Sequence, residues 1–142
     1  MKKLLFFIPA LLFCVNTFGQ TLTFKDLLNL ANGQDVKAYL ISKSFTLTDN
    51  TDKIEFYYLN KGTKSEQRVM YVPNKNGISY NTRDLHYVNG IIKEAGKKLH
   101  LMLTDDNSQT TFYSFSGLNV DLHININKIQ GVGVISIGKL NP

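Results

Sequence analysis

The chain has 142 residues, of which 43% are hydrophobic and 19% are charged, and its formal net charge is +5 at pH 7. This length suits a single domain with a sizeable core, and the chain contains no low-complexity stretch and no linker. The 16 basic and 11 acidic side chains are interspersed without a run of five like charges, which gives little support for binding of nucleic acid.

The chain begins with MKKLLFFIPALLFCVNTFGQ, which has the pattern of an export signal. Lys2 and Lys3 form a charged start, and the apolar run at 4–15 is too short to span a bilayer. The Thr-Phe-Gly segment that ends at Gly19 predicts cleavage after Gly19, which leaves one domain over residues 20–142. Removal of the two lysines lowers the net charge from +5 to +3.

Cys14 leaves lipid attachment as an alternative to ordinary cleavage. Leu11 stands three residues before it, as in lipid-attachment sites, but the bulky Phe13 stands where such sites favour a small residue. With cleavage after Gly19 the mature chain has no cysteine, and therefore no disulfide and no thiolate ligand. We expect a secreted or periplasmic protein of a Gram-negative-type bacterium without a membrane span.

Two short helices and four strands are predicted for the first half. Thr23 and Asp26 form a capping box at the start of the first helix, and Asp35 caps the second. The hydrophobic period then changes to two, between clusters of turn residues. This predicts a meander of the strands Phe45–Thr48, Lys53–Asn60, Glu66–Val72 and Ile78–Asn81.

The second half begins with the clearest amphipathic helix, in TRDLHYVNGIIKEAGKKL. Its apolar residues recur at spacings of three and four and are expected to hold it against the sheet: Leu85, Val88, Ile92, Ala95 and Leu99. A second meander is predicted from the strands Leu99–Thr104, Gln109–Ser116, Val120–Asn127 and Val132–Ile137. The third of these alternates cleanly, with Val120, Leu122, Ile124 and Ile126 on one face.

The two halves resemble each other at an offset of 56 residues, since LTDNTDKIEFYY at 47–58 corresponds to LTDDNSQTTFYS at 103–114. Chance is the alternative, because turns followed by Phe-Tyr are common in β proteins. Helix, turn, aromatic pair and strand order agree, however, so the sequence predicts an α+β fold of two tandem units, about 20–82 and 83–142. Each unit would be a helix followed by a four-stranded antiparallel meander, with the helices packed on one face of the sheet.

This layout resembles the β-lactamase-inhibitor-protein type of fold and the PepSY-like domains of exported bacterial proteins. The resemblance covers the mature chain in architecture and rests on no residue motif. It implies an exported binding or inhibitory role, although a fold does not fix a function.

Motifs for catalysis and cofactors are incomplete. GVISIGKL at 133–140 resembles a phosphate-binding loop, but Leu140 replaces the magnesium-binding hydroxyl and the run is typical of a strand. The acidic turns DNTD and DDNS lack the glycine and distant glutamate of a calcium loop. The histidines His86, His100 and His123 lack ligand spacing, so no metal, cofactor or catalytic set is expected, although their convergence in space is left open.

The aromatic residues suggest a binding surface. Alternation sends Tyr57 and Tyr58 to opposite faces, and if Phe56 and Tyr58 point toward the helices, Tyr57 and Leu59 point away. An uncovered aromatic patch often marks a partner site, although the second half of the chain could also cover it. The candidate binding residues are Tyr57, Leu59 and Tyr113.

Two functions follow from these patterns. The first is an exported non-enzymatic module that binds a protein or a cell-envelope component through a sheet face. The second is a small envelope enzyme or ligand carrier with a site built from distant residues such as Asp105, His123 and Tyr113. A deep pocket with convergent polar groups would favour the second function.

Overall fold

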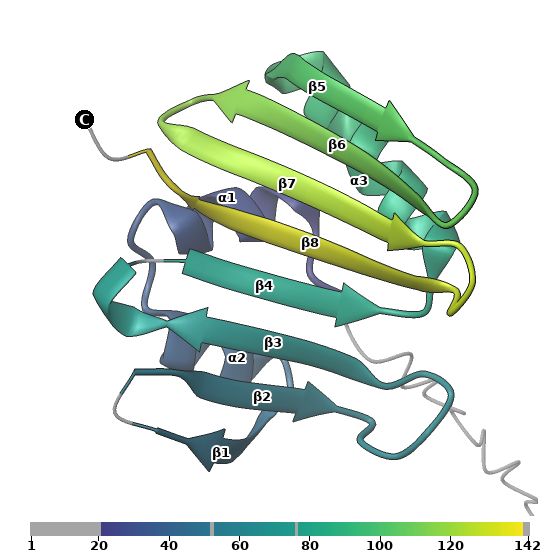
Figure 1. Ribbon diagram of the computed structural model, residues 1–142. Coiled ribbons are helices and arrows are strands. Elements are labelled where there is room, and N and C mark those ends of the chain that lie inside the picture. Colours follow the sequence, from purple (N-terminus) through teal and green to yellow (C-terminus); the bar gives the residue numbers. More distant parts are fainter. Residues whose placement is uncertain (1–20, 52, 76, 141–142) are drawn as a thin grey trace, which may run out of the picture.

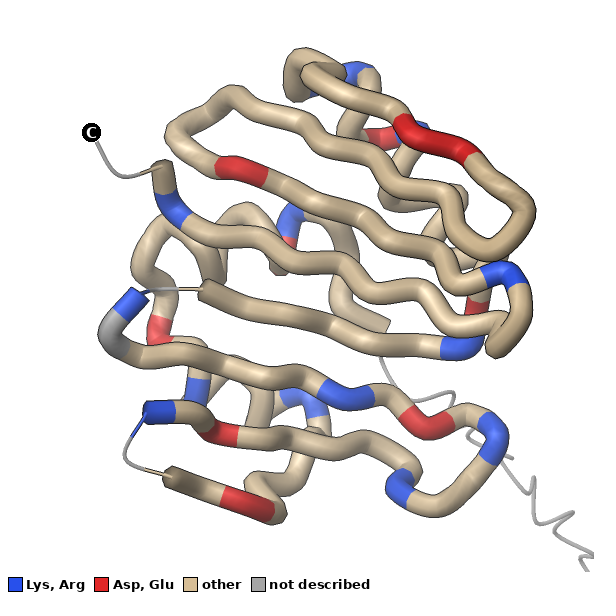
Figure 2. Tube along the Cα trace, viewed as in Figure 1, with Lys and Arg blue, Asp and Glu red and all other residues tan. Residues whose placement is uncertain are grey.

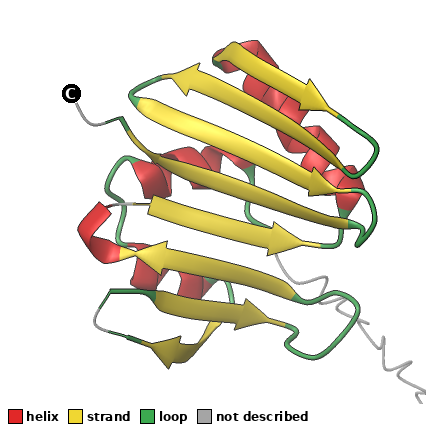
Figure 3. Ribbon diagram, viewed as in Figure 1, coloured by secondary structure: helices red, strands yellow, loops and turns green. Residues whose placement is uncertain are grey.

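The structure is a computed structural model that describes residues 21–51, 53–75 and 77–140. The predicted export signal at 1–19, with Cys14 and the cleavage site after Gly19, lies outside the described residues. The described chain forms one eight-stranded antiparallel sheet with its helices on one face (Figures 1 and 3). The prediction of an α+β fold with helices on an antiparallel sheet is therefore confirmed.

The sheet has the strand order β1-β2-β3-β4-β8-β7-β6-β5. Strands β1 to β4 are consecutive neighbours, as are β5 to β8, and the antiparallel pairing of β4 with β8 joins the two halves into one continuous sheet. The strands of the first half are β1 (Thr46–Asn50), β2 (Glu55–Leu59), β3 (Gln67–Val72) and β4 (Gly77–Thr82). The strands of the second half are β5 (His100–Asp106), β6 (Thr110–Gly117), β7 (Val120–Asn127) and β8 (Val132–Lys139).

The first two helices begin where the sequence places their caps. The helices are α1 (Phe24–Ala31), α2 (Val36–Ser42) and α3 (Leu85–Lys98), and a short 3-10 turn covers Pro73–Lys75. The Thr23 hydroxyl accepts from the Asp26 amide while the Asp26 carboxylate accepts from the Thr23 amide, which confirms the capping box. The carboxylate of Asp35 accepts a hydrogen bond from the backbone amide of Ala38 at 3.0 Å and caps α2. The carboxylate of Asp84 caps α3 in the same way, by accepting from the amide of Tyr87 at 2.9 Å.

The core lies between the helices and the facing side of the sheet. Residues paired directly across antiparallel strands share a face, so the register defines a row that crosses the sheet under the helices. This row contains Leu47, Tyr57, Val69, Tyr80, Ile135, Ile124 and Tyr113. The hydroxyl of Tyr80 donates to Gln67 at 2.7 Å, so the polar atoms of these two buried side chains satisfy each other.

Helix α3 is rotated slightly from the predicted position. Val88 and Ala95 are buried as expected, but the buried isoleucine is Ile91, whereas Ile92 is only half-buried. Ile91 is three residues after Val88 and Ile92 is four residues after it, so either one could share the apolar face of the helix. Packing against the sheet buries Ile91. The alternation predicted for β7 is confirmed, because Val120, Leu122 and Ile124 are buried on one face and Ile126 is half-buried on the same face.

No helix in the described part of the chain combines the length and the apolar character needed to cross a membrane.

Candidate functional site

The side of the sheet opposite the helices is called the open face here. Figure 1 shows all three helices on the far side of the sheet, so no described element covers this face. The register gives two rows of open-face side chains that cross the sheet from β2 to β6. One row contains Tyr58, Arg68, Asn81, Val134, Asn125 and Phe112, and the other contains Phe56, Met70, Ser79, Ser136, His123 and Ser114.

The predicted orientation of strand β2 is wrong. Tyr57 is 0% exposed and Leu59 is 7% exposed, because both point toward the helices. Burial, with a smaller effect of the hydrogen bond to the Glu55 carboxylate, raises the pKa of the Tyr57 hydroxyl. Phe56 and Tyr58 are the residues on the open face, where both are half-buried. A side chain with almost no exposed surface cannot anchor a partner, so Tyr57 and Leu59 belong to the core.

Tyr113 is also on the helix side of the sheet. It is opposite Ile124, whose side chain is buried, and its ring stacks on that of Phe115 with centroids 6.3 Å apart. Its neighbour Phe112 reaches the open face and stacks on His123, with centroids 5.8 Å apart and planes 17° apart. The aromatic pairs of β2 and β6 therefore have the same orientation, with the phenylalanine outward and the following tyrosine inward.

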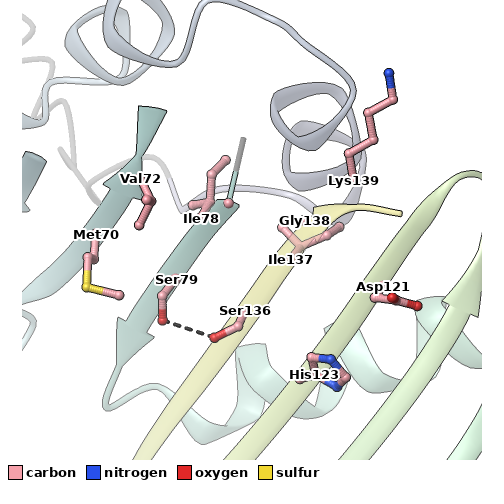
Figure 4. A pocket seen from close by; sticks show the side chains of 11 residues that line it. Met70, Val72, Ile78, Ser79, Asp121, His123, Ser136, Ile137, Gly138 and Lys139 are labelled. Atoms are coloured by element: carbon pink, nitrogen blue, oxygen red, sulfur yellow. Dashed lines mark hydrogen bonds between the residues drawn. The ribbon is translucent and has the colours of Figure 1, made fainter. Parts of the chain in front are cut away.

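A groove of about 310 Å³ crosses the middle of the open face, where β4 meets β8 (Figure 4). Gly77 and Gly138 lie side by side in it, since a Cβ on Gly138 would be 3.8 Å from the Cα of Gly77. Two adjacent positions without side chains lower the surface there and create the groove. The side chains around it include Met70, Val72, Ser79, Asp121, His123 and Ser136.

The polar groups of the groove do not form a catalytic set in the described structure. The hydroxyls of Ser79 and Ser136 bond to each other at 3.1 Å, and no hydrogen bond among the described residues joins either serine to His123. His123 instead stacks on Phe112. The groove can bind a group of mixed polarity, but it lacks the base-to-nucleophile hydrogen bond that would activate a serine.

The distant-residue site suggested by the sequence does not assemble either. Asp105 and His123 are on the open face, because they pair with Phe112 and Ser136, whereas Tyr113 is on the helix side. Among the histidines, His86 is on α3 behind the sheet and His100 begins the edge strand β5. The described residues include no group of three potential metal ligands, so these histidines do not form a metal site there.

The open-face residues that sequence reasoning missed are Phe56, Tyr58, Met70 and Phe112. Strand β2 alone is ambiguous because apolar residues occupy both of its faces. The signal was in β3, where Arg68 is exposed and alternates with the buried Val69. Because Tyr58 pairs with Arg68 and Tyr57 pairs with Val69, the charged partner identifies the outward face of both strands.

Among known proteins, the chain matches no family model, no curated protein and no solved structure. Its candidate function therefore depends on the geometry of the open face.

Proposed function

We propose that this protein is an exported, non-enzymatic binding module that holds a protein partner on the open face of its sheet. The observation that carries the proposal is that Phe56, Tyr58, Met70 and Phe112 lie on a face that no described element covers. Aromatic and methionine side chains are enriched at protein interfaces, where the aromatic rings bury large areas with few rotatable bonds and methionine adapts to the partner's surface.

The composition of the open face also suits a partner that binds reversibly. Ser79, Ser136, Ser114 and Asn125 separate the apolar side chains, so polar atoms are available for hydrogen bonds across the contact. A wholly apolar face of this width would favour aggregation, whereas apolar anchors within a polar field are typical of non-obligate interfaces.

The tandem architecture is part of the proposal. We infer that the chain contains two copies of a helix-plus-meander unit, because equivalent residues occupy equivalent places. Phe56 pairs with Asp49 on the open face, and Phe112, 56 residues later, pairs with Asp105. Joining two such units through β4 and β8 doubles the width of the face, which offers a larger contact than a single four-stranded unit.

Export of the chain is proposed from the N-terminal segment, with cleavage after Gly19 and a secreted or periplasmic location. Mass spectrometry of protein from the producing cell would then show an N-terminus at Gln20. A lipid on Cys14 would contradict this and would attach the protein to a membrane surface.

The binding proposal is tested by capture of a partner from cell-envelope extract on the immobilised protein. The double variant Phe56→Ala with Phe112→Ala should weaken capture by well over about 30-fold, since truncating even one interface anchor costs about 2 kcal/mol. The control is Ile41→Ala, which truncates an exposed apolar side chain on α2, on the helix side. Equal capture by wild type, variant and control would refute the open face as the binding surface.

A ligand carrier is the second candidate, and the groove of about 310 Å³ is the observation in its favour. Its volume is at the lower end of the range for small-molecule sites. Ser136→Phe would fill this groove without touching the aromatic anchors. Loss of a bound small molecule with unchanged protein capture would support the carrier function instead.

A further inference from the structure

Both arginines of the chain, Arg68 and Arg83, line one groove of about 260 Å³. The groove is at the end of the open face where β3 begins and β4 ends, and basic and acidic positions adjoin there in Figure 2. Its other lining residues are Glu66, Asn81, Thr82, Gln130 and Val132. The remaining 14 of the 16 basic residues are lysines, so arginine is concentrated at this one place.

Arg68 is held in position by the residue opposite it. Arg68 and Asn81 pair directly across β3 and β4. With the amide oxygen of Asn81 turned toward the guanidinium, Arg68 donates to it from Nη2 at 2.6 Å and from Nε at 3.1 Å. A guanidinium has five N–H donors, so this contact fixes the plane of the group and leaves other donors for a ligand.

Neither arginine is neutralised by a described acidic residue. The ion pair within the described residues joins Lys128 to Asp106. Glu66 lines the groove, but its Oε2 accepts a hydrogen bond from the amide of Gly62 at 2.7 Å. Two guanidiniums and one carboxylate give the groove a net charge of +1, which matches one singly charged anion.

Arginine differs from lysine in presenting a planar fork that matches a carboxylate with two parallel hydrogen bonds. A dianionic phosphate would bring a second negative charge close to Glu66, which favours a carboxylate over a phosphate. We propose that Arg68 and Arg83 form a binding site for the carboxylate of an acidic side chain. The proposal rests on the proposed function, since this side chain belongs to the protein partner held on the open face.

The site can be tested without knowing the partner. Uniformly ¹⁵N-labelled protein should give two arginine Nε–H signals, one from each arginine. Sodium chloride is replaced stepwise by sodium acetate at constant ionic strength. The chemical shifts of both signals should then change with acetate concentration along saturable curves that fit one dissociation constant. Inorganic phosphate, tested in the same way, should bind more weakly than acetate.

Arg83→Gln should weaken the acetate response of Arg68 by about tenfold, since a charge-assisted hydrogen bond contributes about 1.5 kcal/mol or more. The matched control is Lys75→Gln, which removes one positive charge in the turn at Pro73–Lys75, at the other end of β3. This control should leave the response unchanged.

Three results would overturn the proposal. They are linear, unsaturated shifts in the wild type, an equal loss in Lys75→Gln, and saturable binding that appears only in Glu66→Gln. The last result would mean that Glu66 already neutralises the arginines. The titration does not depend on Phe56 or Phe112, so failure of this site and failure of the open-face proposal are distinguishable.

Discussion

Replacing Gly133 with alanine tests how α3 rests on the sheet. Gly133 is buried on the helix side of β8, directly beneath Val88 of α3. A Cβ at position 133 would be 2.4 Å from Cγ2 of Val88, 3.2 Å from its Cγ1 and 3.3 Å from its Cβ. The absence of a side chain at this position lets the helix approach the strand closely.

The expected destabilisation follows from the stiffness of Val88. Its side chain is 0% exposed, and a β-branched residue in a helix has one strongly preferred rotamer. The helix must therefore shift, at a cost of about 1–3 kcal/mol for an overpacked core. Alanine also restricts the unfolded chain, which offsets about 0.4–1 kcal/mol. The difference between these ranges is a net loss of about 0–2.6 kcal/mol, and the midpoints of the ranges give about 1.3 kcal/mol.

Chemical denaturation monitored by far-UV circular dichroism would measure this loss. The matched control is Gly90→Ala, because Gly90 is in the middle of α3 and a Cβ there meets no atom within 4 Å. The control should gain about 0.5–1 kcal/mol from helix propensity, so the same substitution has opposite signs at the two positions. In the double variant Gly133→Ala with Val88→Ala, the loss of free energy of unfolding should be smaller than the sum of the two single losses. The new methyl group at position 133 then occupies the space that the valine side chain leaves.

An unchanged or increased stability of Gly133→Ala would refute the reasoning. It would mean that α3 does not contact β8 at Gly133, and the assignment of the two faces of β8 would have to be revised.

Three further predictions address the core and one ion pair. Ile91→Ala should cost about 2–5 kcal/mol in free energy of unfolding and Ile92→Ala clearly less, because Ile91 is 3% exposed and Ile92 is half-buried; equal losses would contradict the rotation of α3. Tyr57→Ala should cost about 3–5 kcal/mol in the same assay, whereas a small loss would return Tyr57 to the surface. Hydrogen bonds from Lys128 and Thr111 lower the pKa of the Asp106 carboxyl in the folded protein. These bonds therefore stabilise the fold at pH values above the pKa that Asp106 has in the unfolded chain, and this stabilisation is lost as the pH falls through the lower pKa of the folded state. Lys128→Gln should raise that pKa in a carboxyl-carbon NMR titration, and an unchanged value would show that the pair does not form in solution.

Much of the fold was predictable because local signals and packing agree. The caps at Thr23 and Asp35 bind the amides that a helix start leaves free, and they require no tertiary context. The two faces of strand β7 are predictable because its polar and apolar residues alternate without exception from Val120 to Asn127. These elements follow from chemistry within a few neighbouring residues.

The candidate site was less predictable because its residues are defined by pairing between strands. Phe56, Tyr57, Tyr58 and Leu59 offer two apolar faces, and no property of the segment itself selects one. The selection comes from Val69, whose buried side chain extends the core beside Tyr57. Likewise, the groove depends on Gly77 and Gly138, which are 61 residues apart in sequence and adjacent only after β4 pairs with β8.

Strand β3 connects the two grooves of the open face. Arg68 lines the groove with the arginines, whereas Met70 and Val72 line the central groove, and all three alternate on the same side of β3. At about 3.3 Å per residue, the backbone positions of Arg68 and Val72 are about 13 Å apart. A single extended segment of about five residues can span this distance, with an acidic side chain at one end and an apolar side chain at the other. Binding of such a segment would therefore weaken both on loss of a guanidinium and on filling of the central groove, because both contacts would then be made by one partner.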